Sequence, residues 1–208
     1  MAKTSSTRKL HLRGPACNGE AGQALVEFAV SVVFLTILLA GLLDITRAFH
    51  YTVGLQGAVR AGARHGAYYS STQGRTPYLD DADIKAAVDQ VLSGDGLPPS
   101  TFRASTTCLA PIDGNSWVNP RYGSSAYPPA ANTPWLYICY DTQGSQKTGT
   151  LATPPGAGTA SPYTSTDLVV ILLDRYGLIG GLSTEYLKSG SSLTSIQLTA
   201  FQHFSVQG

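Results

Sequence analysis

The chain contains, at residues 19–44, the segment GEAGQALVEFAVSVVFLTILLAGLLD, an apolar run of membrane length that includes one carboxylate near its start. From Ala24 to Leu43 the only ionisable side chain is that of Glu27. A helix of roughly 20 residues spans the hydrocarbon core of a bilayer, about 30 Å. An acid within such a helix is unfavourable unless something compensates its charge. The segment therefore predicts a membrane-spanning helix in which Glu27 has a specific role.

Basic residues lie on one side of this run. Asp44 is the first charged residue after it, and the residues before it include Lys3, Arg8, Lys9 and Arg13. The positive-inside rule therefore predicts that residue 1 is cytoplasmic and that the chain beyond Asp44 lies outside. An ordinary secretory signal peptide is the alternative, because it also has a basic start and an apolar core. The run is longer than the usual signal core, and no small-x-small cleavage pair closes it.

Composition excludes several functional classes. The 208 residues are 43% apolar and 13% charged, about half the charged fraction of soluble domains, with a net charge of +1. The absence of a basic stripe argues against nucleic-acid binding. The sequence has no nucleophile elbow, phosphate-binding loop or His-Glu-x-x-His pair, and its four histidines are scattered. We therefore expect one modest domain plus an anchor, with no enzymatic activity, metal or cofactor.

The three cysteines, Cys17, Cys108 and Cys139, lack the paired short spacings of a zinc site. If the apolar run is an anchor, Cys108 and Cys139 share the oxidising side of the membrane and can form a disulfide. On the chain-entropy model that bridge would stabilise the fold by about 3–4 kcal/mol. Two unrelated buried thiols are the alternative.

The apolar pattern continues beyond the membrane segment at helical spacing, which predicts one helix from about residue 24 to 68. Four glycines in its second half each cost about 1 kcal/mol relative to alanine in a helix interior. They are Gly54, Gly57, Gly62 and Gly66. Their small size suggests a lateral packing surface for other helices, with local looseness as the alternative. Arg60 and Arg64 are like charges one turn apart, which repel each other mildly. They either pair with an acid of a partner or are solvated.

The remaining chain predicts a second, shorter helix at residues 79–96 and four strands at 101–110, 134–141, 167–174 and 195–204. Asp80, Asp81 and Asp83 are better explained as helix-capping acids than as calcium ligands. We expect an α+β fold, in which a small antiparallel sheet of about four strands packs on the long N-terminal helix. Cys108 and Cys139 fall in the first two predicted strands.

A long loop, residues 111–134, separates the first two predicted strands and contains Trp117, Tyr122 and Tyr127. Loops of this length are uncommon unless they are functional or disordered. Exposed aromatic side chains are typical of contact surfaces, so these three residues are candidates for surface contact.

The N-terminal segment resembles a known family. Glu27 is the fifth residue after Gly22, and Phe28 follows it, a spacing similar to the class III signal of type IV pilins. Together, VEFAVSVVFLTILLAGLLDITRAF at 26–49 and LQGAVRAGARHGA at 55–67 resemble a TadE-like pseudopilin, a minor pilin of the tight-adherence (Flp) type IV pilus family. The resemblance covers residues 22–67.

This resemblance implies a pilin-like organisation. Residues 1–22 would be a cytoplasmic leader that a prepilin peptidase removes between Gly22 and Gln23. Residues 23–43 would span the membrane, 44–69 would continue the helix, and 70–208 would form the extracytoplasmic domain, at the membrane or in the pilus. Glu27, Phe28, Arg60 and Arg64 would act in assembly. The implied partners are the peptidase, other pilin and pseudopilin subunits, the membrane and the pilus assembly platform.

Two other functions remain open from the sequence. The first is an uncleaved single-pass membrane protein that acts as an accessory or adhesion module with an extracytoplasmic binding domain. The second is an anchored binding domain or enzyme whose site has no recognised motif. Cleavage after Gly22 distinguishes the structural minor pilin from both.

Overall fold

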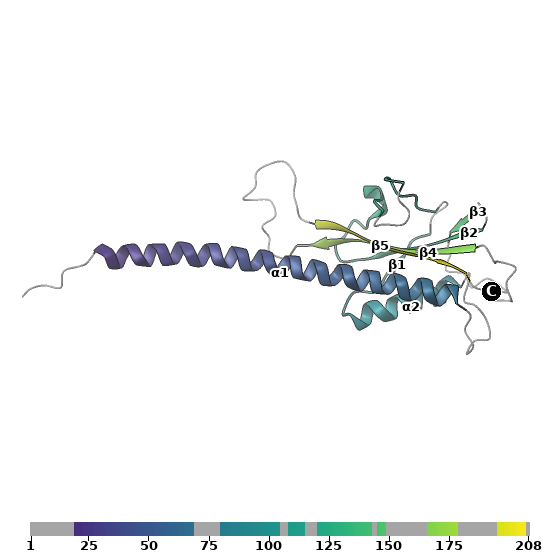
Figure 1. The fold of residues 1–208 in the computed structure, drawn as a ribbon, viewed down its shortest axis with the longest axis horizontal. Helices are drawn as coiled ribbons and strands as arrows, with labels where there is room; N and C mark the ends of the chain where they lie inside the picture. Colours follow the sequence, from purple (N-terminus) through teal and green to yellow (C-terminus); the bar gives the residue numbers. More distant parts are fainter. Residues whose placement is uncertain are drawn as a thin grey trace, which may run out of the picture. The chain divides into compact units, whose positions relative to one another are not determined.

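A computed structural model describes residues 19–68, 80–104, 108–114, 120–142, 145–148, 166–178 and 195–206. The chain divides into two compact units, residues 1–42 and 43–208. Helix α1 runs from Gly19 to Ala67 and is drawn in purple to blue in Figure 1. Its continuity confirms the long helix predicted from the apolar pattern.

The second helix, α2, spans Asp81–Gly94. Asp80 is its N-cap and accepts a hydrogen bond from the backbone N–H of Asp83 at 3.2 Å, which satisfies one of the donors left unpaired at a helix start. The capping role predicted for Asp80 is therefore confirmed. Asp81 also lies in the first turn, but its buried carboxylate accepts a hydrogen bond from the Tyr140 hydroxyl instead.

Five described strands form one mixed sheet, in the order β1-β2-β4-β5 with β3 also paired to β2. They are β1 (Thr101–Phe102), β2 (Trp135–Thr142), β3 (Ser145–Thr148), β4 (Thr166–Gly177) and β5 (Ser195–Ser205). The predicted α+β class is confirmed. Residues 105–107 of the first predicted strand lie outside the described residues. In the described part, 101–104 and 108–110, only Thr101 and Phe102 form strand pairs, and they run parallel to β2 rather than antiparallel.

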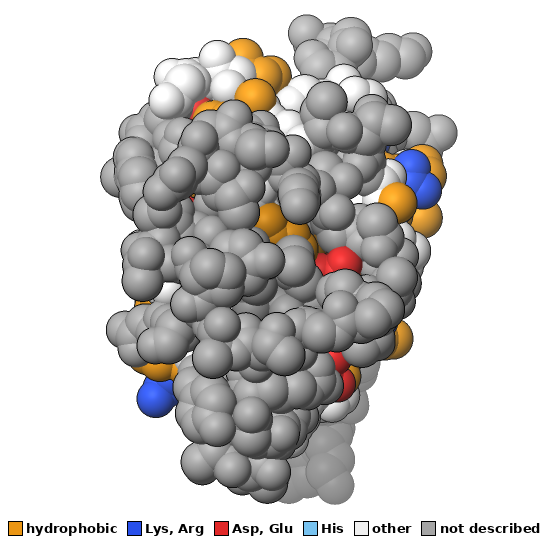
Figure 2. All heavy atoms as spheres, turned by 90° about the vertical axis from the view of Figure 1, so that its right-hand side faces the viewer, with side chains coloured by type: hydrophobic (Ala, Val, Ile, Leu, Met, Phe, Trp, Pro, Cys, Tyr) orange, Lys and Arg blue, Asp and Glu red, His pale blue; other side chains and the backbone are white. Residues whose placement is uncertain are grey.

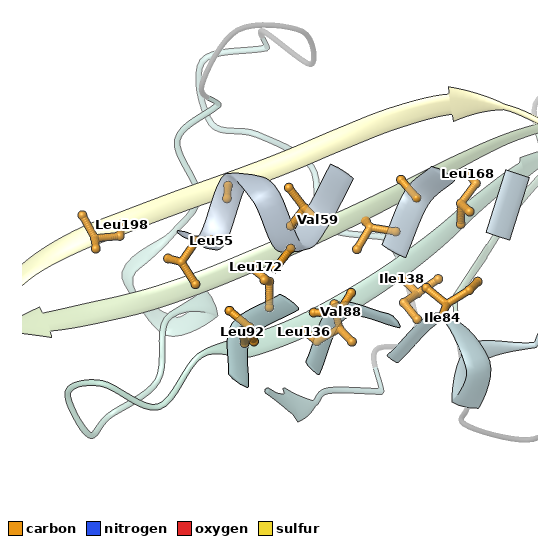
Figure 3. Close-up of a cluster of buried hydrophobic side chains, with 14 of the residues drawn as sticks. Leu55, Val59, Ile84, Val88, Leu92, Leu136, Ile138, Leu168, Leu172 and Leu198 are labelled. Atoms are coloured by element: carbon orange, nitrogen blue, oxygen red, sulfur yellow. The ribbon is translucent and has the colours of Figure 1, made fainter. Parts of the chain in front are cut away.

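Helices cover one face of the sheet. The main core packs side chains of α1 and α2 against alternate residues of the strands, such as Leu136 and Ile138 of β2 and Leu168 and Leu172 of β4. In Figure 3, Leu55 and Val59 of α1 lie among these strand residues, with Ile84, Val88 and Leu92 of α2 beside them. Residues 43–67 of α1 are thus an integral part of the second unit.

A second apolar layer covers the opposite face. It contains Tyr122, Ala126 and Tyr127 from the segment around the 3₁₀ turn η1 (Ser124–Ala126), packed on Tyr137, Ile171 and Leu173. Figure 1 shows η1 and the two helices on opposite sides of the strands. Because β4 is covered on both faces, its sequence LVVILL is apolar without alternation.

On the face drawn in Figure 2, the described side chains that reach the surface are mostly apolar or uncharged, with a few separated Lys or Arg and Asp or Glu groups. This distribution agrees with the low charged fraction of the sequence, 13%.

Candidate functional site

The predicted cleavage residues lie at the start of α1. Gly22 is in the first turn of the helix, and a Cβ atom added to it would meet no other atom within 4 Å. Gln23 is exposed. The local structure therefore leaves free space around Gly22, and nothing in the fold of the described residues requires glycine there.

Glu27 and Gln23 are in contact within the helix. The side-chain amide of Gln23 donates a hydrogen bond of 3.1 Å to the Glu27 carboxylate, four residues further along. The Ser31 hydroxyl donates to the Glu27 carbonyl at 2.8 Å, and the neighbouring Phe28 is 69% exposed. The only side-chain partner described for the Glu27 carboxylate is a neutral amide, so within residues 19–42 its charge is not balanced by a cation.

The apolar side chains of this part of α1 have no protein cover in the first unit. Leu25, Phe28 and Phe34 are each about two-thirds exposed or more, and the other large apolar side chains up to Leu43 are also exposed, by 42–65%. The stretch Gly22–Ala67 contains a window long and apolar enough to cross a membrane. A single N-terminal helix of this kind fits a membrane anchor.

Arg60 and Arg64 lie on the exposed side of α1, one turn apart. They line a groove of about 750 Å³ whose other walls include residues of α2 and Phe204 of β5. The Arg64 guanidinium lies 5.9 Å from the centre of the Tyr68 ring, which also lines the groove. Within the described residues, no carboxylate pairs with either guanidinium. The structure thus brings these two predicted assembly residues together on one surface.

Three glycines in the second half of α1 pack against other parts of this chain, including α2. A Cβ at Gly62 would come within 2.4 Å of Val88 Cγ2, and one at Gly66 within 2.5 Å of Leu168 Cδ2. At Gly54 the nearest atom would be Leu97 Cδ1, at 2.6 Å. Both sequence-based explanations, a lateral surface for other helices and local looseness, are therefore wrong for these three. Their small size allows α2 and the sheet to approach α1 closely.

Gly57 is different from the other three, because a Cβ there would make only an ordinary contact of 3.7 Å with Val91. It lines the groove beside Arg60 and Arg64. Of these four glycines in the second half of α1, Gly57 is therefore the one that lies on an open surface.

The structure brings Cys108 and Cys139 together. Cys139 is buried in β2, whereas Cys108 is half-buried and lies outside β1, which ends at Phe102. The expectation that both lie in paired strands is therefore corrected. The two side chains interact as thiols. The pKa of Cys139 is raised above its ordinary value, chiefly by a hydrogen bond with Cys108 and also by burial. Their proximity is compatible with a disulfide, which remains a prediction.

The predicted aromatic contact surface is not formed by the residues that the structure describes. Trp117 lies outside them. Tyr122 and Tyr127 are only 6% and 5% exposed, because they form the second apolar layer on the sheet, and burial raises the pKa of Tyr122. The Tyr127 hydroxyl shares a 2.7 Å hydrogen bond with that of Thr199. These two tyrosines are structural, which corrects the expectation that they contact a surface.

Sequence reasoning missed two buried contacts that join the helices to the sheet. Tyr51 of α1 donates a hydrogen bond to Asp174 of β4, and Tyr140 of β2 donates to Asp81 of α2. Asp174 is fully buried, and its position at the end of an apolar strand was the one available signal. A charged side chain that continues the inward-facing positions of a strand indicates a buried polar contact.

Comparison with protein families matches residues 22–64 to the family described as TadE-like protein. This segment is TadE-like. The match begins at Gly22, ends at Arg64, and so contains each of the predicted cleavage and assembly residues. It confirms the resemblance predicted from the sequence for this segment. No curated protein and no solved structure matches the chain.

The TadE-like segment extends across both units. Its first part is the exposed apolar stretch of α1, and its second part contains the core residues Leu55, Val59 and Ala63. The apolar stretch that fits a membrane anchor and part of the core of the second unit thus lie in one continuous matched segment. The sheet and α2 lie outside the matched residues.

Proposed function

We propose that the protein is a minor pilin or pseudopilin of a tight-adherence type IV pilus, which packs through its N-terminal helix to initiate or build the filament. The observation that carries this proposal is the placement of Gly22 and Glu27, with the acid at the fifth position after the glycine, at the start of a TadE-like helix. In this proposal a prepilin peptidase cuts between Gly22 and Gln23, and the chain acts as a structural subunit rather than as an enzyme.

Cleavage would change the environment of Glu27. It creates an α-amine on Gln23, whose pKa near 8 makes it largely cationic at neutral pH. Gln23 and Glu27 lie one turn apart on α1, and the side-chain amide of Gln23 already donates to the Glu27 carboxylate at 3.1 Å. The new cation could therefore pair with Glu27 in the same chain, or with that of a neighbouring subunit, where pairing would set axial register.

The same proposal places the anchor in the cytoplasmic membrane, with the N-terminus inside and residues 70–208 outside. Its support is the basic residues before the apolar run and Asp44 after it. The other proposed partners are further pilin and pseudopilin subunits and the assembly platform of the pilus.

The decisive experiment is an intact mass of the protein from cells that carry a prepilin peptidase. The mature chain should begin at Gln23. Gly22→Leu should block processing because a bulky side chain obstructs the peptidase, and the space around Gly22 means that the fold itself is not perturbed. Gly41→Leu is the matched control, since that glycine of the same helix is equally uncrowded and lies after the cut.

Recovery of a chain that still begins upstream of Gln23 in the presence of active peptidase would overturn the pilin proposal. It would favour the uncleaved accessory or adhesion protein instead.

A further inference from the structure

The groove beside Arg60 and Arg64 lies within the second unit and has walls from two helices, together with Tyr68 after α1 and Phe204 of β5. Helix α1 contributes Arg60, Ala61 and Arg64, and helix α2 contributes Ala87, Gln90 and Val91, around a volume of about 750 Å³. Ala61, Ala87 and Val91 are half-buried, so they form an apolar floor that is still open to an incoming group.

The charge of this groove is of one sign. Arg60 and Arg64 are exposed at its rim, His65 also lines it, and none of its lining residues is acidic. Neither arginine forms an ion pair with the part of the chain that the structure describes. Like charges one helical turn apart disfavour the isolated helix by a few tenths of a kcal/mol. A partner that brings carboxylates would relieve this repulsion.

The spacing of the two arginines favours a helix as the partner. Side chains at i and i+4 on a helix are separated by about 5–6 Å at Cβ, so two acids with the same spacing on another helix match Arg60 and Arg64. The small residues Gly57, Ala61 and Ala87 leave room for a second helix to approach closely. Guanidinium–carboxylate pairs are strong and directional, which would fix the register of the incoming helix.

We propose that this groove docks an acidic amphipathic helix of a different pilin-type subunit. Two carboxylates three or four residues apart pair with Arg60 and Arg64, and the apolar side of that helix packs on Ala61, Ala87 and Val91. This inference rests on the proposed function, because it assigns the neighbour that the second unit contacts within the pilus system.

The test uses the full chain in cells that make the complete pilus system, with a photo-crosslinking amino acid at Gln90, an exposed residue of α2 in the groove wall. We expect an adduct with a segment of another subunit that carries the paired acids, identified by peptide mapping. Arg60→Glu combined with Arg64→Glu should lower the adduct yield by about tenfold or more, because reversed charge repels the carboxylates. Replacing the two mapped acids by Lys should restore the yield.

The matched control combines Arg47→Glu with Arg121→Glu. These arginines are also exposed but lie outside the groove, so this pair makes the same change of net charge and should leave the yield unchanged. If the Glu pair unfolds the chain, Arg60→Gln with Arg64→Gln provides the same comparison without reversed charge. The proposal would be overturned if the folded groove variant gave an unchanged yield of adduct, or if no adduct formed at all. It would also be overturned if the only adduct were with lipid or with a second copy of this chain.

Failure of this inference is distinguishable from failure of the proposed function. Processing after Gly22 is measured by mass in the same cells. A chain that is processed but gives no charge-dependent adduct refutes the groove alone. An unprocessed chain refutes the pilin assignment, whereas a charge-dependent, charge-restorable adduct would still support the groove.

Discussion

The Tyr51 hydroxyl of α1 donates a 2.6 Å hydrogen bond to the buried carboxylate of Asp174 on β4, across 123 positions of sequence. Asp174 also accepts backbone N–H bonds from Thr133 at 3.0 Å and from Arg175 at 2.7 Å. A buried carboxylate is tolerated only when its lone pairs are satisfied. This contact therefore fixes α1 against the sheet at one defined position.

Tyr51→Phe should destabilise the second unit by about 1–3 kcal/mol, because it removes one partner of a buried charged group without creating a large cavity. Thermal unfolding of the purified full-length protein in detergent measures the effect. Tyr68→Phe is the control, since Tyr68 is exposed and should change stability little. Equal effects of the two substitutions would contradict the role assigned to the buried contact.

Asp174 should also make stability depend on pH. Burial raises its pKa above the ordinary aspartate value of 3.8, while its hydrogen bonds act in the opposite direction. A raised pKa means that the folded state binds the proton more tightly than the unfolded state. This contribution to stability is therefore complete below the ordinary pKa and is lost as pH rises through the raised folded pKa.

The corresponding variant is Asp174→Asn, which keeps an acceptor oxygen but does not titrate. Its melting temperature, measured from about pH 4 to 7, should change less with pH than that of the wild type. In Tyr51→Phe, the loss of stability with rising pH should occur at a higher pH than in the wild type. The reason is that the hydrogen bond from Tyr51 lowers the pKa of Asp174. Identical pH profiles for wild type and Asp174→Asn would refute this assignment.

Gly62→Ala should destabilise the protein even though alanine favours helices. The added Cβ would lie 2.4 Å from Val88 Cγ2, and overpacking of this kind costs about 1–3 kcal/mol, more than the gain of up to about 1 kcal/mol in helix propensity. Gly57→Ala is the control on the same helix, and its uncrowded site should give a small gain. Denaturant unfolding of both variants decides the matter, and a stabilising Gly62→Ala would show that α2 does not pack closely there.

Cys108 and Cys139 should be joined by a disulfide in protein recovered from outside the cytoplasm. Non-reducing peptide mapping should find the linked pair, and reduction should lower the free energy of unfolding by about 3–4 kcal/mol. Cys17→Ser should have no effect, because Cys17 lies on the leader side of the predicted cut. Recovery of both residues as thiols from exported protein would contradict this prediction.

Glu27→Gln tests the assembly role of the acid. Glutamine keeps the shape and an acceptor for the Gln23 amide but removes the charge, so the variant should still be processed, inserted and folded. We expect it to lose co-purification with other pilin subunits. Glu20→Gln, which removes a carboxylate from the leader, is the control. Undiminished assembly of Glu27→Gln would indicate an acid that is solvated at the membrane interface.

Local patterns in the sequence were sufficient to predict an apolar helix that fits an anchor, the continuity of α1, the helix α2 with its Asp80 cap, and strands β2, β4 and β5. The start of α1 was not predicted, since the helix begins at Gly19 rather than near residue 24. Each predicted element depends on periodicity or capping within a short window, because a helix or strand exposes its apolar residues at a fixed spacing. The TadE-like segment was recognisable for the same reason, since its predicted cleavage and assembly residues lie along one continuous helix.

Partners distant in sequence were decided only by the tertiary structure. The crowding at Gly62 depends on Val88, and the burial of Tyr122 and Tyr127 depends on strands β2, β4 and β5. The same glycine can serve a lateral surface or an internal contact, and the same tyrosine can be exposed or buried, with no change in local pattern. Which occurs depends on the chain topology that places one element across another, and no single window of sequence contains that information.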